Sequence, residues 1–117
     1  MAKVVALVDD LFFQAKMLET ARQVGVELKT VTTGDALLAE AQQSAPALLI
    51  VDLQARSGGI ELLERLRAAG NQRPVIAFLS HVQVELAERA RAAGCQQVMP
   101  RSKFTQNLAA ILSQAGS

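Results

Sequence analysis

Tryptophan and tyrosine are absent from this sequence, and cysteine and histidine occur once each. The only aromatic side chains among its 117 residues are four phenylalanines, so the core must be mainly aliphatic. Because Cys95 stands alone, no intrachain disulfide can form, which favours a reducing compartment such as the cytoplasm. Cys95 and His81 are also too few to build a Cys/His zinc cluster.

Blocks of like charge and long apolar runs are missing as well. The formal net charge is +1, and the linear sequence shows no basic patch of the kind that binds nucleic acid. No apolar stretch approaches the roughly 18 residues of a membrane helix. The first apolar run is too short for a signal peptide core and leads directly into Asp9 and Asp10. We therefore expect one cytoplasmic domain over residues 1–117, without direct contact to nucleic acid or membrane.

Short apolar runs alternate with helical patterns along the whole chain. The predicted strands are KVVALV (3–8), ELKTVT (27–32), ALLIV (47–51), PVIAFL (74–79) and QQVM (96–99). Apolar stripes between and after them predict helices that contain Phe13 and Met17, Leu37 and Ala41, Ile60 and Leu63, Leu86 and Ala90, and Phe104 and Leu108. This alternation predicts an α/β fold of parallel strands joined by right-handed crossovers.

Polar side chains stand at the ends of all five predicted strands, and in an open parallel sheet ligands bind beyond the carboxyl ends of the strands. If the first and third strands are neighbours, about 4.8 Å apart, three carboxylates crowd one edge, and each opposes ionisation of the others unless a cation joins them. Mg²⁺ takes such oxygen ligands, together with water and phosphate. The pattern therefore predicts a phosphoryl site formed by Asp9 and Asp10, Asp52, Ser80, and Arg101 or Lys103.

Several of these residues also have a simpler structural interpretation. Asp10 could cap the first helix, since aspartate is a favoured N-cap residue. Ser80 and Gln83 fit the S-x-x-Q capping box. Arg101 and Lys103 could be solvated charges. The grouping of the three aspartates, rather than any one of them, favours a site.

ALVDD, LLIVD, PVIAFLS and the Arg/Lys after QQVM, in this order and spacing, resemble the receiver domains of bacterial two-component response regulators. The resemblance covers almost the whole chain. It implies a three-layer, doubly wound, flavodoxin-like fold, in which five helices cover a five-stranded parallel sheet of order 2-1-3-4-5.

The resemblance also implies the chemistry of the site. Asp52 would take a phosphoryl group from a sensor histidine kinase or a histidine phosphotransfer protein. Asp10, Asp52 and the backbone carbonyl of Gln54 would hold Mg²⁺, with Asp9 acting through water. Such a domain is not an enzyme in the usual sense, because it accepts the group on its own aspartate and loses it by self-catalysed hydrolysis.

Switching would depend on the residues after the fourth and fifth predicted strands. Ser80 would hydrogen-bond the phosphoryl group and report its presence, and Arg101 or Lys103 would take the place of the family lysine. Phosphorylation would then change the affinity for a downstream protein partner. The sequence leaves open whether the chain forms a homodimer and whether it acts alone or as part of a longer protein.

Four features depart from the family pattern. Arginine at position 101 is not a neutral replacement for lysine. His81 follows Ser80 where the family usually has a small residue, and we expect it to act as an access gate that slows phosphoryl entry or loss. The loop after Asp52 lacks the usual proline and is about one residue shorter. Val98 stands where many receivers carry a switching aromatic residue.

These departures keep a second interpretation open, namely a receiver-like protein-interaction module that does not switch. An enzyme of another α/β class is disfavoured, because Gln54 stands where an aspartate-dependent phosphatase generally has a second acid, and the G-x-G-x-x-G, G-x-x-x-x-G-K-[ST] and G-x-S-x-G motifs are absent. Phe12 lies off the apolar stripe of its helix, beside the acidic edge. It either covers the end of the sheet or docks a partner helix.

Overall fold

The computed structural model describes residues 3–56, 58–80 and 83–116. Strands and helices alternate along the chain as predicted: β1 (Val4–Leu7), α1 (Leu11–Val24), β2 (Leu28–Val31), α2 (Gly34–Ser44), β3 (Leu48–Asp52), α3 (Gly59–Ala68), β4 (Val75–Leu79), α4 (Val84–Ala92), β5 (Gln97–Pro100) and α5 (Arg101–Gly116). No helix in these ranges is both long enough and apolar enough to cross a membrane.

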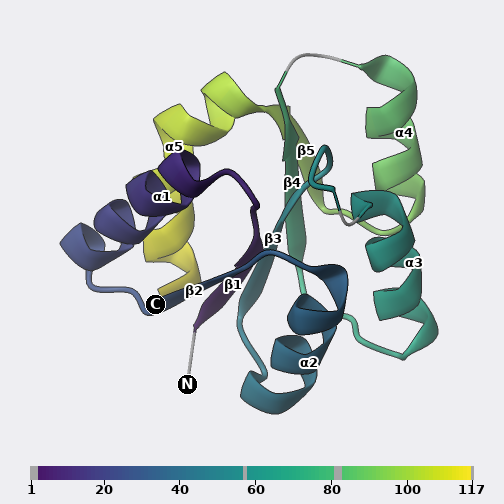
Figure 1. The fold of residues 1–117 in the computed structure, drawn as a ribbon, viewed down its shortest axis with the longest axis horizontal. Coiled ribbons are helices and arrows are strands. Elements are labelled where there is room, and N and C mark those ends of the chain that lie inside the picture. The colour runs from purple at the N-terminus through teal and green to yellow at the C-terminus, as the bar shows by residue number, and fades with distance from the viewer. Residues whose placement is uncertain (1–2, 57, 81–82, 117) are drawn as a thin grey trace.

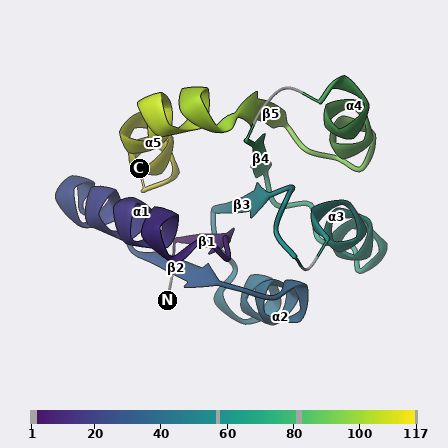
Figure 2. The same ribbon diagram turned by 45° about the horizontal axis from the view of Figure 1, so that its top comes forward.

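The five strands form one parallel sheet in the order β2-β1-β3-β4-β5, which confirms the predicted topology (Figure 1). β1 and β3 are direct neighbours, with Leu7 paired to Val51. The segments that leave these two strands therefore start at the same edge of the sheet. Figure 2 turns this carboxyl edge toward the viewer.

Helices cover both faces of the sheet, with α1 and α5 on one side and α2, α3 and α4 on the other (Figures 1 and 2). Successive residues of a strand point to opposite faces. Val4 and Ala6 accordingly pack in the core beneath α1 and α5, whereas Val5 and Leu7 pack in the core beneath the other three helices. β1, β3 and β4 are buried along their whole length, as expected for parallel strands covered on both faces.

Three of the four phenylalanines form a cluster in the core between the sheet, α1 and α5. The rings of Phe78 and Phe104 are stacked with their centroids 4.6 Å apart, and the Phe13 ring lies 5.3 Å from Phe78 and 6.1 Å from Phe104. Phe12, the fourth, is 91% exposed. The apolar stripe, which includes Phe13 and leaves out Phe12, therefore predicted correctly that Phe13 is buried and Phe12 is not.

The two predicted helix caps have different outcomes. The Asp10 side chain accepts hydrogen bonds from the backbone N–H groups of Phe12 and Phe13, so Asp10 is the N-cap of α1 as predicted. The Ser80–Gln83 capping box is wrong. α4 begins at Val84 with Gln83 as its N-cap, which makes no side-chain capping bond, and the Ser80 hydroxyl donates to another loop instead.

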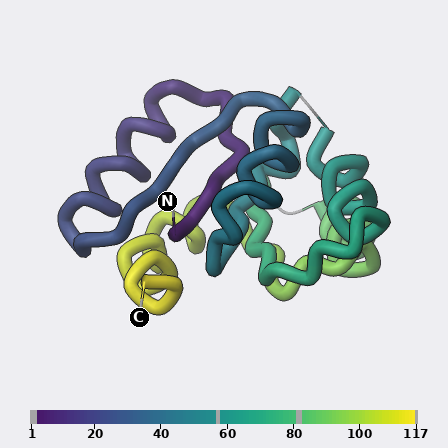
Figure 3. Tube along the Cα trace, turned by 90° about the horizontal axis from the view of Figure 1, so that it is seen from below, coloured from purple at the N-terminus to yellow at the C-terminus, as the bar shows by residue number. Residues whose placement is uncertain are grey.

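α5 follows β5 without an intervening loop, so its first residue, Arg101, lies at the carboxyl edge of the sheet. The helix then runs back along the sheet and ends on the opposite side of the molecule, which Figure 3 shows from below. The chain thus delivers a basic side chain to the edge where β1 and β3 deliver the aspartates.

Candidate functional site

Asp52 is the last residue of β3 and is only 3% exposed. It is the one charged side chain that is buried among the residues described. Asp9 and Asp10, in the connection from β1 to α1, are half-buried at the same edge. The predicted meeting of three carboxylates therefore occurs, because β1 and β3 are neighbours.

Backbone N–H groups fix the orientation of all three carboxylates. Asp52 Oδ1 accepts from the Gln54 N–H at 2.9 Å. Asp10 Oδ1 accepts from Phe12 and Phe13 N–H at 3.0 and 3.2 Å. Asp9 Oδ2 accepts from the Arg56 N–H, in the connection from β3 to α3, at 2.9 Å. For Asp10 and Asp52, the second oxygen, Oδ2, is left to face the interior of the site.

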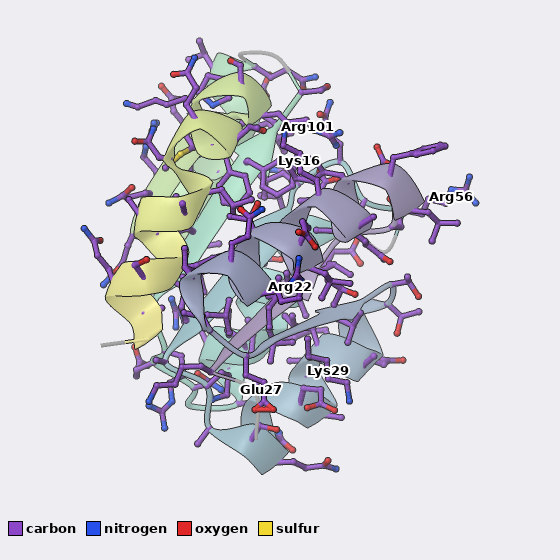
Figure 4. The ribbon with its side chains drawn as sticks, turned by 90° about the vertical axis from the view of Figure 1, so that its left-hand side faces the viewer. Lys16, Arg22, Glu27, Lys29, Arg56 and Arg101 are labelled. Carbon is purple, nitrogen blue, oxygen red and sulfur yellow. The ribbon has the colours of Figure 1, made fainter. Side chains whose placement is uncertain are left out.

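The Arg101 guanidinium lies between these two remaining oxygens. Its Nη1 is 3.3 Å from Asp10 Oδ2, and its Nη2 is 3.3 Å from Asp52 Oδ2. Figure 4 shows Arg101 and Arg56 toward the same end of the molecule, with Arg101 in the first turn of α5. A single cation therefore bridges the ends of β1 and β3.

Two aromatic rings lie within cation–π distance of this guanidinium. Its central carbon lies 4.6 Å from the Phe13 ring centroid and 5.4 Å from that of Phe78. Such contacts suit arginine, whose planar, weakly hydrated cation stacks on aromatic faces. Sequence reasoning missed this support, although Phe13 and Phe78 were both predicted to be buried. Arg101 Nε is buried and has no hydrogen-bond partner among the residues that the structure describes.

The environment shifts the pKa values of the two bridged carboxyls in opposite directions. Burial raises the pKa of Asp52, and the negative charges of Asp9 and Asp10 add to this rise. The Gln54 N–H and the Arg101 guanidinium offset it in part. The pKa of Asp10 is lowered, mainly by the hydrogen bond from the Phe13 N–H and also by Arg101. Asp52 is thus the carboxylate whose charge the fold accommodates least.

A hydrogen-bonded bridge closes one side of the site. The Gln54 side-chain oxygen accepts from both the backbone N–H and the hydroxyl of Ser80, at 2.5 and 2.6 Å. It links the segment after β3 to the segment after β4. The sequence predicted Gln54 only as a carbonyl ligand, and a side-chain bond between two loops has no local sequence signal.

The remaining predicted residues have different outcomes. Lys103 is exposed in the first turn of α5, whereas Arg101 contacts the acidic residues. The predicted gate, His81, lies outside the described residues. In the shorter loop after Asp52, Gly58 has φ 77° and precedes α3 directly, so glycine permits a tight turn there.

Val98 is half-buried in β5. The resemblance aligns this position with the switching aromatic residue of many receivers. Val98 lines a cavity of about 190 Å³ between β5 and α4, together with Leu79, Ala87 and Arg91. Aliphatic and polar groups therefore surround the place where a switching ring would pack.

The comparisons with known proteins identify the family. The sequence model of the response regulator receiver domain matches residues 5–113. The chain belongs to this family. As a receiver domain it has a phosphoacceptor role in two-component signalling, in which receivers interact with histidine kinases or phosphotransfer proteins and with effector partners. No curated protein matches the chain in sequence.

Solved structures share the receiver fold at low sequence identity. The chemotaxis response regulator CheY4 of Vibrio cholerae superposes with a TM-score of 0.84 at 22% identity, over 98% of both chains. NtrX from Brucella abortus gives 0.80 at 22% identity, over 98% of this chain and 26% of the longer NtrX chain. The beryllofluoride-activated NtrC4 receiver domain dimer gives 0.80 at 14% identity, over 98% of this chain and 99% of that one.

The receiver's donor atoms suit Mg²⁺ in chemistry but not in their present arrangement. Carboxylate and carbonyl oxygens are the ligands that this hard cation prefers. Within the described ranges, however, no group of three or more acidic, histidine or cysteine side chains is arranged to hold a metal. The inward oxygens of Asp10 and Asp52 already contact Arg101.

Proposed function

We propose that this receiver domain takes a phosphoryl group from a phosphohistidine onto Asp52 and thereby changes its affinity for a protein partner. The observation that carries the proposal is the meeting of three aspartates at the carboxyl edge, where one cation, Arg101, bridges Asp10 and the buried Asp52. Membership of the family supports the same role.

The reaction needs an oxygen of Asp52 to attack phosphorus while the bond from phosphorus to the donor nitrogen breaks. The products are an acyl phosphate on Asp52 and a free histidine that takes up a proton. Water attack on the same phosphorus later restores the carboxylate and releases inorganic phosphate. In the proposed phosphorylated state, Arg101 donates to phosphoryl oxygens, and the Ser80 hydroxyl exchanges Gln54 for the phosphoryl group.

Mg²⁺ would be held by Asp10, Asp52 and the Gln54 carbonyl, with Asp9 acting through water. When bound, the ion would neutralise charge that develops on the phosphoryl oxygens. The other groups act without it: the Gln54 N–H orients Asp52, and the Phe12 and Phe13 N–H groups orient Asp10.

The test is incubation of the chain with acetyl phosphate and Mg²⁺, followed by intact-mass measurement. We expect one phosphoryl adduct per chain. Borohydride reduction of the acyl phosphate and peptide mapping should then locate it at Asp52 and not at Asp9 or Asp10. An adduct elsewhere, or no adduct with acetyl phosphate or any kinase, would overturn the proposal. A parallel sample in EDTA shows how far the reaction depends on Mg²⁺.

We further propose that Phe12 docks the phosphodonor. Phe12 is 91% exposed and Leu11 is 73% exposed, and both lie in the first turn of α1 beside Asp10. An apolar pair next to an acidic site suits a partner helix that carries its phosphohistidine into the site. The earlier alternative, in which Phe12 covers the end of the sheet, fits this exposure less well.

Phe12→Ala is expected to slow phosphoryl transfer from a phosphohistidine protein about thirtyfold, because an aromatic residue central to an interface typically contributes about 2 kcal/mol. Labelling by acetyl phosphate should be unchanged. Val84→Ala, an exposed apolar residue on α4, is the matched control and should leave both rates unaltered. Equal slowing with both donors would argue against docking.

A receiver-like interaction module that does not switch is the second candidate function, favoured by Val98 and the cavity beside it. The two candidates differ in whether an Asp52 adduct changes the affinity for a partner. Under either one we propose a cytoplasmic protein that binds other proteins rather than nucleic acid or membrane. We leave homodimer formation, seen in the NtrC4 neighbour, to measurement.

A further inference from the structure

We propose that Arg101 is a resident counter-cation that occupies the cation position of the site and competes with Mg²⁺ for Asp10 and Asp52. The inference rests on the proposed function, because it concerns the same site. It adds that the resting protein binds divalent metal weakly, and that metal enters only when the guanidinium leaves.

The competition is inferred from the geometry of the two carboxylates. Each bridged carboxylate has one oxygen held by backbone N–H groups, and each turns its other oxygen, Oδ2, toward the same guanidinium at 3.3 Å. Mg²⁺ binds carboxylate oxygen at about 2.0–2.1 Å and tolerates little departure from octahedral geometry. A Mg²⁺ ion that binds both Oδ2 atoms would have to take the position between Asp10 and Asp52 that the guanidinium now occupies.

Arginine is suited to this role in a way that lysine is not. Two separate nitrogens of one planar group reach two carboxylates on neighbouring strands, whereas a lysine ammonium is a compact point charge. The Phe13 and Phe78 rings also lie within cation–π distance of the guanidinium carbon. The departure from the family lysine at this position thus changes how the acidic edge is neutralised.

The bridge is nevertheless incomplete. Within the described part of the chain, Arg101 Nε is buried without a hydrogen-bond partner, and the two contacts to the carboxylates are longer than the optimum for charge-assisted hydrogen bonds. Both features reduce the stability of the bridged state. A divalent ion at sufficient concentration, or an incoming phosphoryl group that offers new acceptor oxygens, can therefore displace the guanidinium.

The experiment is calorimetric titration of the metal-free protein with Mg²⁺, since the absence of tryptophan and tyrosine rules out intrinsic fluorescence from those residues. Arg101→Met keeps an apolar stem on the rings and removes the charge. Arg101→Lys keeps the charge but not the planar fork. Lys16→Met, which removes an exposed cation from α1, controls for a general change in charge.

We expect Arg101→Met to lower the Mg²⁺ dissociation constant at least about tenfold and Arg101→Lys to lower it several-fold, whereas Lys16→Met should match the wild type. The melting temperature of the Arg101 variants should also rise with Mg²⁺ at concentrations that leave the wild type unchanged. Arg101→Lys carries the test if Arg101→Met does not fold.

Equal Mg²⁺ affinity of the wild type and both Arg101 variants would overturn the competition and leave the phosphoacceptor proposal intact. A lack of Mg²⁺ binding by every variant would overturn the competition and the proposed metal ligands together. An Asp52 adduct formed in EDTA would then show that the phosphoacceptor function itself survives. Tighter binding in Arg101→Met alone would assign the effect to charge and contradict the bridging geometry.

Discussion

Asp52→Asn is expected to abolish the acyl phosphate adduct completely. The amide has no anionic oxygen with which to attack phosphorus, although it keeps an oxygen that can accept from the Gln54 N–H as Asp52 does. Intact mass after incubation with acetyl phosphate and Mg²⁺ measures the loss. Asp9→Asn is the matched control, since it removes one negative charge from the same edge and should slow labelling without preventing it. Residual adduct in the Asp52 variant would contradict this assignment.

The same Asp52→Asn variant should be more stable than the wild type at neutral pH. Because the folded-state pKa of Asp52 lies above its unfolded value, the folded state binds this proton more tightly. Wild-type stability therefore falls as the pH rises from the unfolded pKa to the folded pKa. Asparagine lacks this titration, so the advantage of the variant is complete above the folded pKa and disappears below the unfolded pKa.

Denaturant unfolding of both proteins across acidic to neutral pH, followed by circular dichroism, measures this difference. The lowered pKa of Asp10 acts in the opposite direction, because its contribution to stability is lost as the pH falls. Asp10 is present in both proteins, so its contribution largely cancels when their free energies of unfolding are compared. A variant that gains its advantage only in acid would show that the charge of Asp52 is stabilising.

Phe104→Ala is expected to lower the free energy of unfolding by about 3–5 kcal/mol. The Phe104 side chain is fully buried and stacks on Phe78, so its removal leaves a cavity between α5 and the sheet. The same substitution at Phe12, which is almost fully exposed, should change stability by no more than about 0.5 kcal/mol. Denaturant unfolding followed by circular dichroism measures both.

Phe104→Ala and Phe12→Ala make the same truncation at a buried and at an exposed position, so comparing them tests the packing of the α1–α5 layer. Comparable losses would mean that the α1–α5 layer is not packed as described. A small loss at Phe104, with a normal unfolding slope, would mean that the site collapses around the missing ring.

Strands and helices were predictable because the apolar pattern is consistent along the chain. Val4 to Leu7 and Leu48 to Val51 are apolar at every position, which is typical of parallel strands covered on both faces. Periodicity gave the alternation of elements, but it did not give the order of the strands. That order came from the resemblance to receiver domains, and the structure confirms it.

The acidic cluster was predictable for a related reason: once β1 and β3 are neighbours, the residues that follow them must meet. The contacts of Arg101 were not predictable, because they depend on side chains from α1, β4 and α5 that are distant in the sequence. The choice between Arg101 and Lys103 required the start of α5, which the sequence did not fix. The bond between Gln54 and Ser80 joins two loops and depends on their spacing in three dimensions.

The ring cluster of Phe13, Phe78 and Phe104 has a consequence for where a signal would leave the domain. If the guanidinium moves away from the two carboxylates, the rings of Phe13 and Phe78 lose their contact with it and can shift. Because Phe104 stacks on Phe78, such a shift would also change the packing of α5. On the other face of the sheet, Val98 is a small aliphatic residue and has no ring that could move in a comparable way. We therefore expect a conformational change on phosphorylation to reach the surface formed by α1 and α5.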